Sequence, residues 1–129
     1  MNPSLQLDLK KLKAEYKQNP LPYVPLNLFR LRVANLVAQY TTELQTDYKQ
    51  LKFRTMKSRW GSCSEHKVLS FNTKLKLLPQ SLVELVVFHE CLHLIYLNHG
   101  AEFKLAMAAK FVDYKQRNYL LKLYGLMKI

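Results

Sequence analysis

The feature that most constrains this chain is an apolar stretch that carries three histidines, Val83–Phe103, with the sequence VELVVFHECLHLIYLNHGAEF. Within it, residues 89–93 have the form H-E-x-x-H. A helix turns about 100° per residue, so His89 and His93 would lie one turn apart on the same face. Two imidazoles at that spacing can share a divalent ion, and Glu90 would lie at the edge of that face. The pattern predicts a buried helix that carries a metal site with a carboxylate beside it.

A third ligand is needed because catalytic zinc sites usually have three protein ligands and a water. His99 is the obvious candidate, since it follows His93 closely and its neighbours, asparagine and glycine, tolerate the left-handed backbone that ends helices. We expect a helix over about 79–97, after which the chain would turn back and present His99 to the metal. Glu102 remains the alternative third ligand.

Length and composition indicate an ordinary globular protein. The 129 residues suit one domain, 1–129, with a hydrophobic core, and 49% of them are hydrophobic. No apolar run of about 18 residues exists that could span a membrane, so no membrane partner is expected. The opening residues MNPSLQLDLKKLK lack the apolar centre of a secretory signal. With only two cysteines, the chain is predicted to carry free thiols in the reducing cytoplasm.

Hydrophobic periodicity predicts an α+β chain. Apolar residues recur at helical spacing in three further segments, 5–18, 26–45 and 101–126, the last with a bend near Asp113. Residues 1–24 would form the N-terminal helix and a proline-rich linker. Alternating patterns at 51–55 and 67–72, joined by turn-like residues, predict a small antiparallel sheet.

The net charge of +11 is unevenly distributed. Between Tyr48 and Gln80, Glu65 is the one acid, against eight bases: Lys49, Lys52, Arg54, Lys57, Arg59, Lys67, Lys74 and Lys76. A field of that sign attracts polyanions or phosphorylated substrates, although a solvated surface explains it equally well. The charge therefore leaves open an anionic, nucleotide-like substrate and weak nucleic-acid binding.

Two motifs, in this order, resemble a known family. The first is Arg59–Ser64, RWGSCS, followed by Phe71-Asn72; the second is the H-E-x-x-H-L run followed by Asn98-His99 and Phe103. Together they are similar to the YgjP-like metallopeptidase domain family, also called DUF45, with a family core over 51–124. That family in turn resembles SprT-like and WLM zinc proteases, which pair a short sheet with an H-E-x-x-H helix.

The resemblance implies a zincin-like fold, with a small antiparallel sheet packed against a central H-E-x-x-H helix and with N- and C-terminal helices on the flanks. It implies a Zn²⁺ site made of His89, His93 and His99, with Glu90 as the general base, although other divalent metals also suit imidazole. It places Arg59 on a sheet edge beside the metal. There Arg59 is our candidate for stabilising negative charge on the substrate or anchoring an anionic group; a plain surface arginine is the alternative.

Two positions depart from the family pattern. Gly100 stands where the family usually has serine, which could loosen a hydrogen bond to the third ligand, and Lys104 replaces a common aromatic residue. Neither departure changes a predicted ligand.

Four further side chains invite a chemical role, but packing or exposure explains each of them. Trp60 fits the core better than a substrate platform, and Gly61 after it would let another segment approach closely. Cys91 would face away from the histidines, so we expect both Cys91 and Cys63 to pack rather than react. His66 would be exposed in a hairpin turn.

The sequence therefore predicts a cytoplasmic metal-dependent hydrolase, and the resemblance makes a peptide the first expected substrate. One alternative is a metal-dependent phosphohydrolase acting on nucleotides, motivated by the basic segment 48–80. The other is a nucleic-acid-associated module in which the metal is structural, which predicts binding that weakens steeply with salt.

Overall fold

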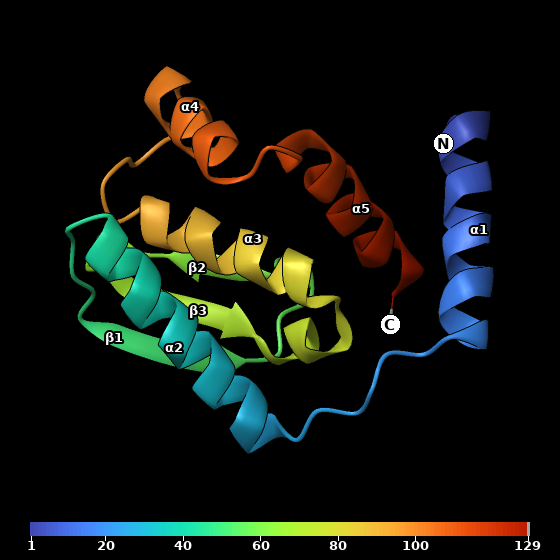
Figure 1. The fold of residues 1–129 in the computed structure, drawn as a ribbon, viewed down its shortest axis with the longest axis horizontal. Helices are drawn as coiled ribbons and strands as arrows, with labels where there is room; N and C mark the ends of the chain where they lie inside the picture. Colours follow the sequence, from blue (N-terminus) through green and yellow to red (C-terminus); the bar gives the residue numbers. More distant parts are fainter. Residues whose placement is uncertain (129) are drawn as a thin grey trace.

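The computed structural model describes residues 1–128, in which helices pack against a three-stranded sheet, so the α+β class is confirmed (Figure 1). Its elements, in chain order, are α1 (Pro3–Gln18), α2 (Leu26–Glu43), β1 (Gln50–Arg54), β2 (Gly61–Cys63), β3 (Val68–Asn72), the 3₁₀-helix η1 (Thr73–Leu77), α3 (Gln80–Leu92), α4 (Ala101–Lys110) and α5 (Tyr114–Met127).

The sheet has the order β1-β3-β2, and its pairing corrects one prediction. β2 and β3 form an antiparallel hairpin, but β1 runs parallel to β3, with Gln50 opposite Val68 and Arg54 opposite Asn72. The sheet is therefore mixed rather than antiparallel. The turn after Cys63 serves the short strand β2, which the alternating pattern did not reveal, and β1 takes the other edge of β3. A tight turn can join only antiparallel neighbours, whereas parallel strands need a longer connection, here residues 55–67.

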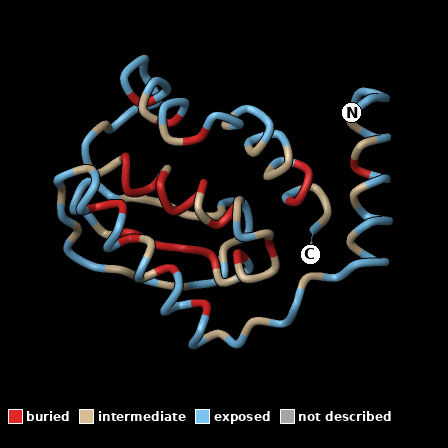
Figure 2. The backbone as a smooth tube through the Cα atoms, viewed as in Figure 1, coloured by how far each residue is buried: buried red, intermediate tan, exposed pale blue. Residues whose placement is uncertain are grey.

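Helix α3 is the centre of the core. Its buried positions lie all round the helix, and it packs against α2, α5 and the strands β2 and β3. Figure 2 shows the buried backbone concentrated in α3 and β3. Apolar contact on several sides removes water from the helix, and this buries the Glu90 side chain with it, at 7% exposure. The predicted central H-E-x-x-H helix is therefore confirmed.

The end of α3 differs from the prediction. The helix ends at Leu92 rather than near Leu97, because the next residues close tighter turns: the N–H groups of Leu94 and Ile95 donate to carbonyls three residues back, both at 3.0 Å. The apolar pattern continues past this end, but Leu97 is 85% exposed, so it does not mark a buried helix face. His93 keeps helical dihedrals (φ −67°, ψ −13°) and with them the one-turn spacing from His89.

The two ends of the chain lie side by side. α1 packs along α5 (Figure 1), where the Tyr16 and Tyr124 rings meet edge to face at 6.1 Å. The predicted bend near Asp113 is confirmed, since the chain leaves its helical path between α4 and α5. Within residues 1–128, no helix has both the length and the apolarity that crossing a membrane would require.

Candidate active site and metal centre

Three histidine side chains converge at the end of α3. The Nε2 atom of His93 lies 3.3 Å from Nε2 of His89 and 2.9 Å from Nε2 of His99, and the three potential ligand atoms all lie within 4.8 Å of one another. Ligand atoms of a tetrahedral zinc site are about 3.3 Å apart when each Zn–N bond is about 2.0–2.1 Å long. The three nitrogens therefore fit a zinc-sized ion.

The tautomer of His93 suits a metal ligand. Its Nδ1 atom lies 2.9 Å from the carbonyl oxygen of Tyr96. Because a carbonyl can only accept, Nδ1 carries the proton and Nε2 presents its lone pair to the cluster. The early end of α3 supplies this acceptor, since the turn after His93 brings the Tyr96 carbonyl back to the ring.

The first turn of α4 packs against the histidine cluster. The buried ring of Phe103 lies 4.7 Å from the His93 ring, nearly parallel to it, and 5.0 Å from the His89 ring. Before it, the Gly100 N–H donates to Asn98 Oδ1 at 3.0 Å, and a Cβ at Gly100 would come within 2.8 Å of that oxygen. A glycine at this position therefore suits the tight loop that carries His99.

The environment favours the neutral form of two of the histidines. The pKa of His89 falls to about 4, first because burial penalises the charged ring and then because His93 and His99 are close. The pKa of His99 is also lowered, by burial and then by His93 and Lys104. A neutral imidazole is the form that binds a metal, so this environment favours ligation at neutral pH.

Glu90 lies beside the cluster under strand β2. Its Oε2 atom is 4.0 Å from Nε2 of His89, and burial raises its pKa to about 7, an increase that the nearby Arg59 reduces. A Cβ at Gly61 would lie 3.0 Å from Cγ of Glu90 and 3.2 Å from the Ser70 carbonyl oxygen. The absence of a side chain at Gly61 therefore lets β2 pass directly over Glu90. The sequence predicted a close approach at this glycine, but not which segment would make it.

A cleft of about 390 Å³ opens in front of the cluster. One wall is the edge strand β2 with the turn after it, and the other is the end of α3 with the loop to α4. The residues that line it are Arg59, Gly61, Ser62, Cys63, Ser64, Glu65, His89, Glu90, His93, Leu97 and His99. Arg59 lies exposed at one end of this cleft, in the loop just before the edge strand β2 rather than on the strand itself.

The other candidates lie as follows. Glu102 is exposed in the first turn of α4, and within residues 1–128 it does not join the histidine cluster. Cys91 is fully buried and burial raises its pKa to about 12, so its packing role is confirmed. Cys63 is half-buried at the cleft wall, where burial and then Glu90 raise its pKa to about 11. His66 is exposed in the hairpin turn, as predicted.

Asn72 is a positioning residue that the sequence analysis did not single out. It is 2% exposed, and its Nδ2 donates to the carbonyl oxygens of Met56 at 3.0 Å and Arg59 at 2.8 Å. Its Oδ1 accepts from the Lys74 N–H at 3.0 Å, and its own N–H donates to the Trp60 carbonyl at 2.9 Å. The available signal was an asparagine between a buried strand and a helix start, the position of an N-cap.

Three histidine nitrogens that converge at the end of the central helix, with a buried carboxylate on that helix, are the arrangement of a zincin-like metallopeptidase in an α+β fold. The sequence matches the family described as YgjP-like, metallopeptidase domain, over residues 7–124, and the chain belongs to that family. It is thus a metal-dependent hydrolase of the metallopeptidase class. The family match begins at residue 7, well before residue 51, where the sequence motifs placed the start of the family core.

Two solved structures share the fold. One is the metallopeptidase zymogen of Methanocaldococcus jannaschii jannalysin, with a TM-score of 0.60 and 21% identity over 71% of this chain and 87% of that one. The other is the metallopeptidase zymogen of Pyrococcus abyssi abylysin, with a TM-score of 0.53 and 16% identity over 59% of this chain and 76% of that one. No curated protein sequence matches the chain. These comparisons give no support to the nucleotide and nucleic-acid alternatives.

Proposed function

We propose that this protein is a zinc-dependent peptidase in which His89, His93 and His99 hold the metal and Glu90 is the general base. The observation that carries the proposal is the convergence of three imidazole nitrogens within 4.8 Å next to a buried carboxylate. Zinc, when bound there, would polarise the scissile carbonyl and make a water acidic enough to attack it at neutral pH. Mn, Co or Ni could occupy the same nitrogens, and zinc is favoured because His-rich open sites are its usual catalytic setting.

Glu90 moves the proton in this scheme. It accepts a proton from the attacking water and returns that proton to the leaving amine, as a positioned carboxylate can do. Its burial against β2 supports this role, since a water-poor setting keeps the carboxylate from exchanging its proton freely with bulk solvent.

Arg59 would stabilise negative charge that develops on the substrate. It lines the same cleft as Glu90 and is close enough to lower the pKa of that carboxyl group. A guanidinium binds a carboxylate or an oxyanion with two hydrogen bonds, which suits either the reacting oxygen or an anionic group of the peptide.

The free edge of β2 would hold the peptide. β2 pairs with β3 on one side, and within residues 1–128 no other strand pairs with it. An extended peptide can add to such an edge through main-chain hydrogen bonds, and β2 lines the cleft throughout its length.

We also propose that residues 1–129 act as one domain with 51–124 as its core. The free thiols of Cys63 and Cys91 are compatible with a reducing cytoplasm.

The test is peptide hydrolysis by zinc-loaded protein, with products identified by mass spectrometry. Glu90→Gln should lower the rate by about 100- to 10,000-fold while zinc still binds, because only proton transfer is lost. His89→Ala should lose both zinc and activity. The matched control is Glu65→Gln, which removes an exposed carboxylate of the same cleft and should keep full activity. Full activity in Glu90→Gln would reject the proton-transfer role.

A further inference from the structure

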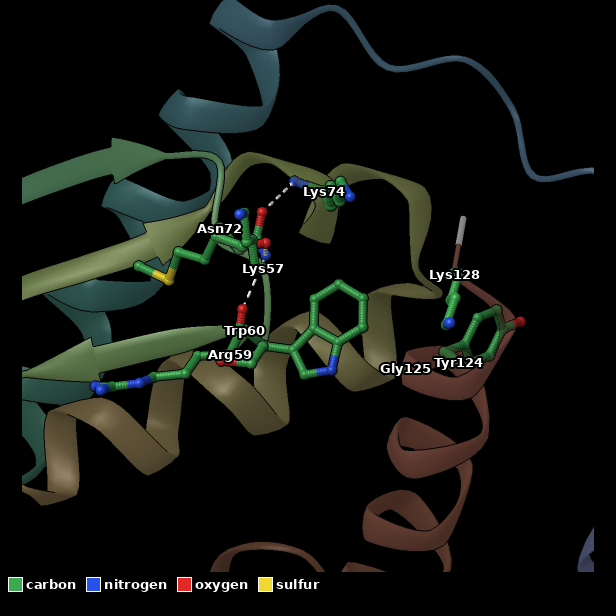
Figure 3. A pocket seen from close by; sticks show the side chains of 10 residues that line it. Lys57, Arg59, Trp60, Asn72, Lys74, Tyr124, Gly125 and Lys128 are labelled. Carbon is green, nitrogen blue, oxygen red and sulfur yellow. Dashed lines mark hydrogen bonds between the residues drawn. The ribbon is translucent and has the colours of Figure 1, made fainter. Parts of the chain in front are cut away.

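A second pocket, of about 360 Å³, lies beside the first residues of β2 (Figure 3). We call it the Trp60 pocket; it is formed by the loop 56–60, the start of η1 and the end of α5. Its aromatic wall is Trp60 with Tyr124, and its cationic groups are Lys57, Arg59, Lys74 and Lys128. It contains none of the three histidines, and its only residue shared with the metal cleft is Arg59.

Hydrogen bonds of the buried Asn72 hold two of the three segments that form the Trp60 pocket. Asn72 donates to the carbonyls of Met56, Arg59 and Trp60 and accepts from the N–H of Lys74, so it ties the loop 56–60 to the start of η1. Figure 3 shows two of these bonds between the walls. A ligand that binds here therefore meets cations whose backbone positions are already set, which lowers the entropic cost of binding.

Within residues 1–128, no carboxylate neutralises the charge of the Trp60 pocket. No carboxylate is among the lining residues, and within residues 1–128 none of Lys57, Arg59 and Lys74 makes an ion pair. The Trp60 indole adds a donor, because its Nε1 faces Gly125, where a Cβ would lie 3.9 Å away, and no group in the described part of the chain accepts from it. Cations and a free N–H beside aromatic rings favour an anion attached to an apolar group.

The Trp60 pocket and the metal cleft are continuous along one stretch of backbone. Residues 56–60 line the pocket, residues 61–65 line the cleft, and Arg59 lines both. A peptide extended along β2 would pass from the metal into the Trp60 pocket. Antiparallel pairs outnumber parallel ones about two- to threefold. In an antiparallel arrangement, the part of the peptide that follows the scissile bond points toward residue 60.

We propose that the Trp60 pocket binds a carboxylate of the peptide substrate on the C-terminal side of the scissile bond. The carboxylate is either the C-terminus of the peptide or an Asp or Glu side chain, because both present the same group to Lys57, Lys74 and the indole N–H. The inference rests on the proposed peptidase function, and it makes that peptidase selective for acidic or C-terminal segments.

The binding test uses the fluorescence of Trp60, the one tryptophan in the chain. The zinc-loaded full chain carrying Glu90→Gln is titrated with four matched peptides that differ in Glu against Gln and in a free or amidated C-terminus. The expected result is a saturable change with a carboxylate-bearing peptide and at least about tenfold weaker binding of its neutral twin, a difference of about 1.4 kcal/mol. The side-chain and C-terminal sources are distinguished by which substitution removes binding.

Variants assign the effect to the Trp60 pocket. Lys57→Met and Lys74→Met should each remove most of the preference for the acidic peptide, since both lysines are exposed and no packing depends on their charge. Lys52→Met is the matched control, because it removes an equally exposed lysine from β1 outside the pocket. Equal binding of acidic and neutral peptides, or unchanged preference in both pocket variants, would overturn the proposal.

Two further measurements distinguish carboxylate binding from phosphate binding, and the proposed subsite from the proposed peptidase function. A nucleoside triphosphate and inorganic phosphate are titrated in the same way; tighter binding of the triphosphate than of any peptide, lost in Lys57→Met, would overturn the carboxylate assignment. In hydrolysis assays, Lys57→Met should raise KM for the acidic peptide and leave kcat unchanged. Acid-selective binding without hydrolysis of any peptide would reject the peptidase function and keep the subsite, whereas hydrolysis without acid preference would reject the subsite alone.

Discussion

The metal cleft along strand β2 and the Trp60 pocket before it differ in how they treat charged groups. At the metal cleft, burial lowers the pKa of His89 and raises those of Glu90 and Cys63, so each side chain is driven toward its neutral form. At the Trp60 pocket, the lysines are exposed to water. Metal binding and proton transfer benefit from a water-poor setting, whereas attraction of an anion needs full charge at the surface. The proposed reaction site thus lies along β2, and the proposed binding site for the substrate carboxylate lies at the loop before it.

Each site has a support of its own in the sheet. Gly61 in β2 lets the strand lie over Glu90, and Asn72 at the end of β3 holds the loop that carries Trp60. We therefore expect that a substitution can damage one site and spare the other, unless it destabilises the whole fold.

The largest effect is expected from His93→Ala. The His93 Nε2 atom is close to both other ring nitrogens, so its removal should lower zinc affinity by at least about 1,000-fold, or about 4 kcal/mol. Competition with a chromophoric chelator measures this loss. Acidic-peptide binding at the Trp60 pocket should persist. His66→Ala, which removes an exposed histidine of the hairpin turn outside the cluster, is the control and should leave zinc affinity unchanged. Loss of acidic-peptide binding in folded His93→Ala would show that the two sites are not independent.

Asn72→Ala should destabilise the whole fold by about 3 kcal/mol, because the Met56 and Arg59 carbonyls and the Lys74 N–H all lose their hydrogen bonds to this buried side chain. Urea unfolding measures the loss, and the Trp60 emission should change in the folded variant. Thr73→Val is the control, since it breaks only the exposed Thr55–Thr73 hydroxyl contact of 3.0 Å and should cost under about 1 kcal/mol. An equal loss in both variants would contradict the positioning role of Asn72.

The alkylation rate of the Cys63 thiol should show how strongly burial at the metal cleft suppresses its charge. Its pKa of about 11 lies above that of an ordinary cysteine at 9.0, so at pH 8 its thiolate fraction is about 100-fold lower than in the unfolded chain. Alkylation by iodoacetamide, followed by peptide mapping, should be slower by about that factor and should accelerate steadily from pH 8 to pH 10. A rate that levels off near pH 9 would show that the cleft wall does not suppress charge.

The smallest expected effect is the difference in salt dependence between peptide binding at the Trp60 pocket and zinc binding at the metal cleft. Raising NaCl from about 50 to 300 mM should weaken acidic-peptide binding at the Trp60 pocket by about threefold, since exposed charges are screened over a shorter distance. Zinc affinity should change less, because ligation by neutral imidazoles involves no exposed ion pair. Equal salt dependence of the two equilibria would mean that the Trp60 pocket does not act through its cations.

Local patterns predicted the elements and the histidines, and failed where distant segments decide the outcome. The one-turn spacing of His89 and His93 is a property of any helix, so it could be predicted without a structure. The early end of α3 could not, because the apolar pattern continues through Ile95 and Leu97, which the fold leaves exposed. The parallel pairing of β1 was missed for a related reason: three-residue β2 carries no alternation long enough to be recognised.

By itself, the sequence determined that an apolar helix would carry paired histidines beside a carboxylate, since helical periodicity acts over a few residues and needs no partner. Only the tertiary structure decided that His99 rather than Glu102 joins them, that Gly61 brings β2 over Glu90, and that Asn72 joins Trp60 to Lys74. These contacts bring together different secondary-structure elements, and their geometry follows from how the elements pack around one core rather than from any local pattern.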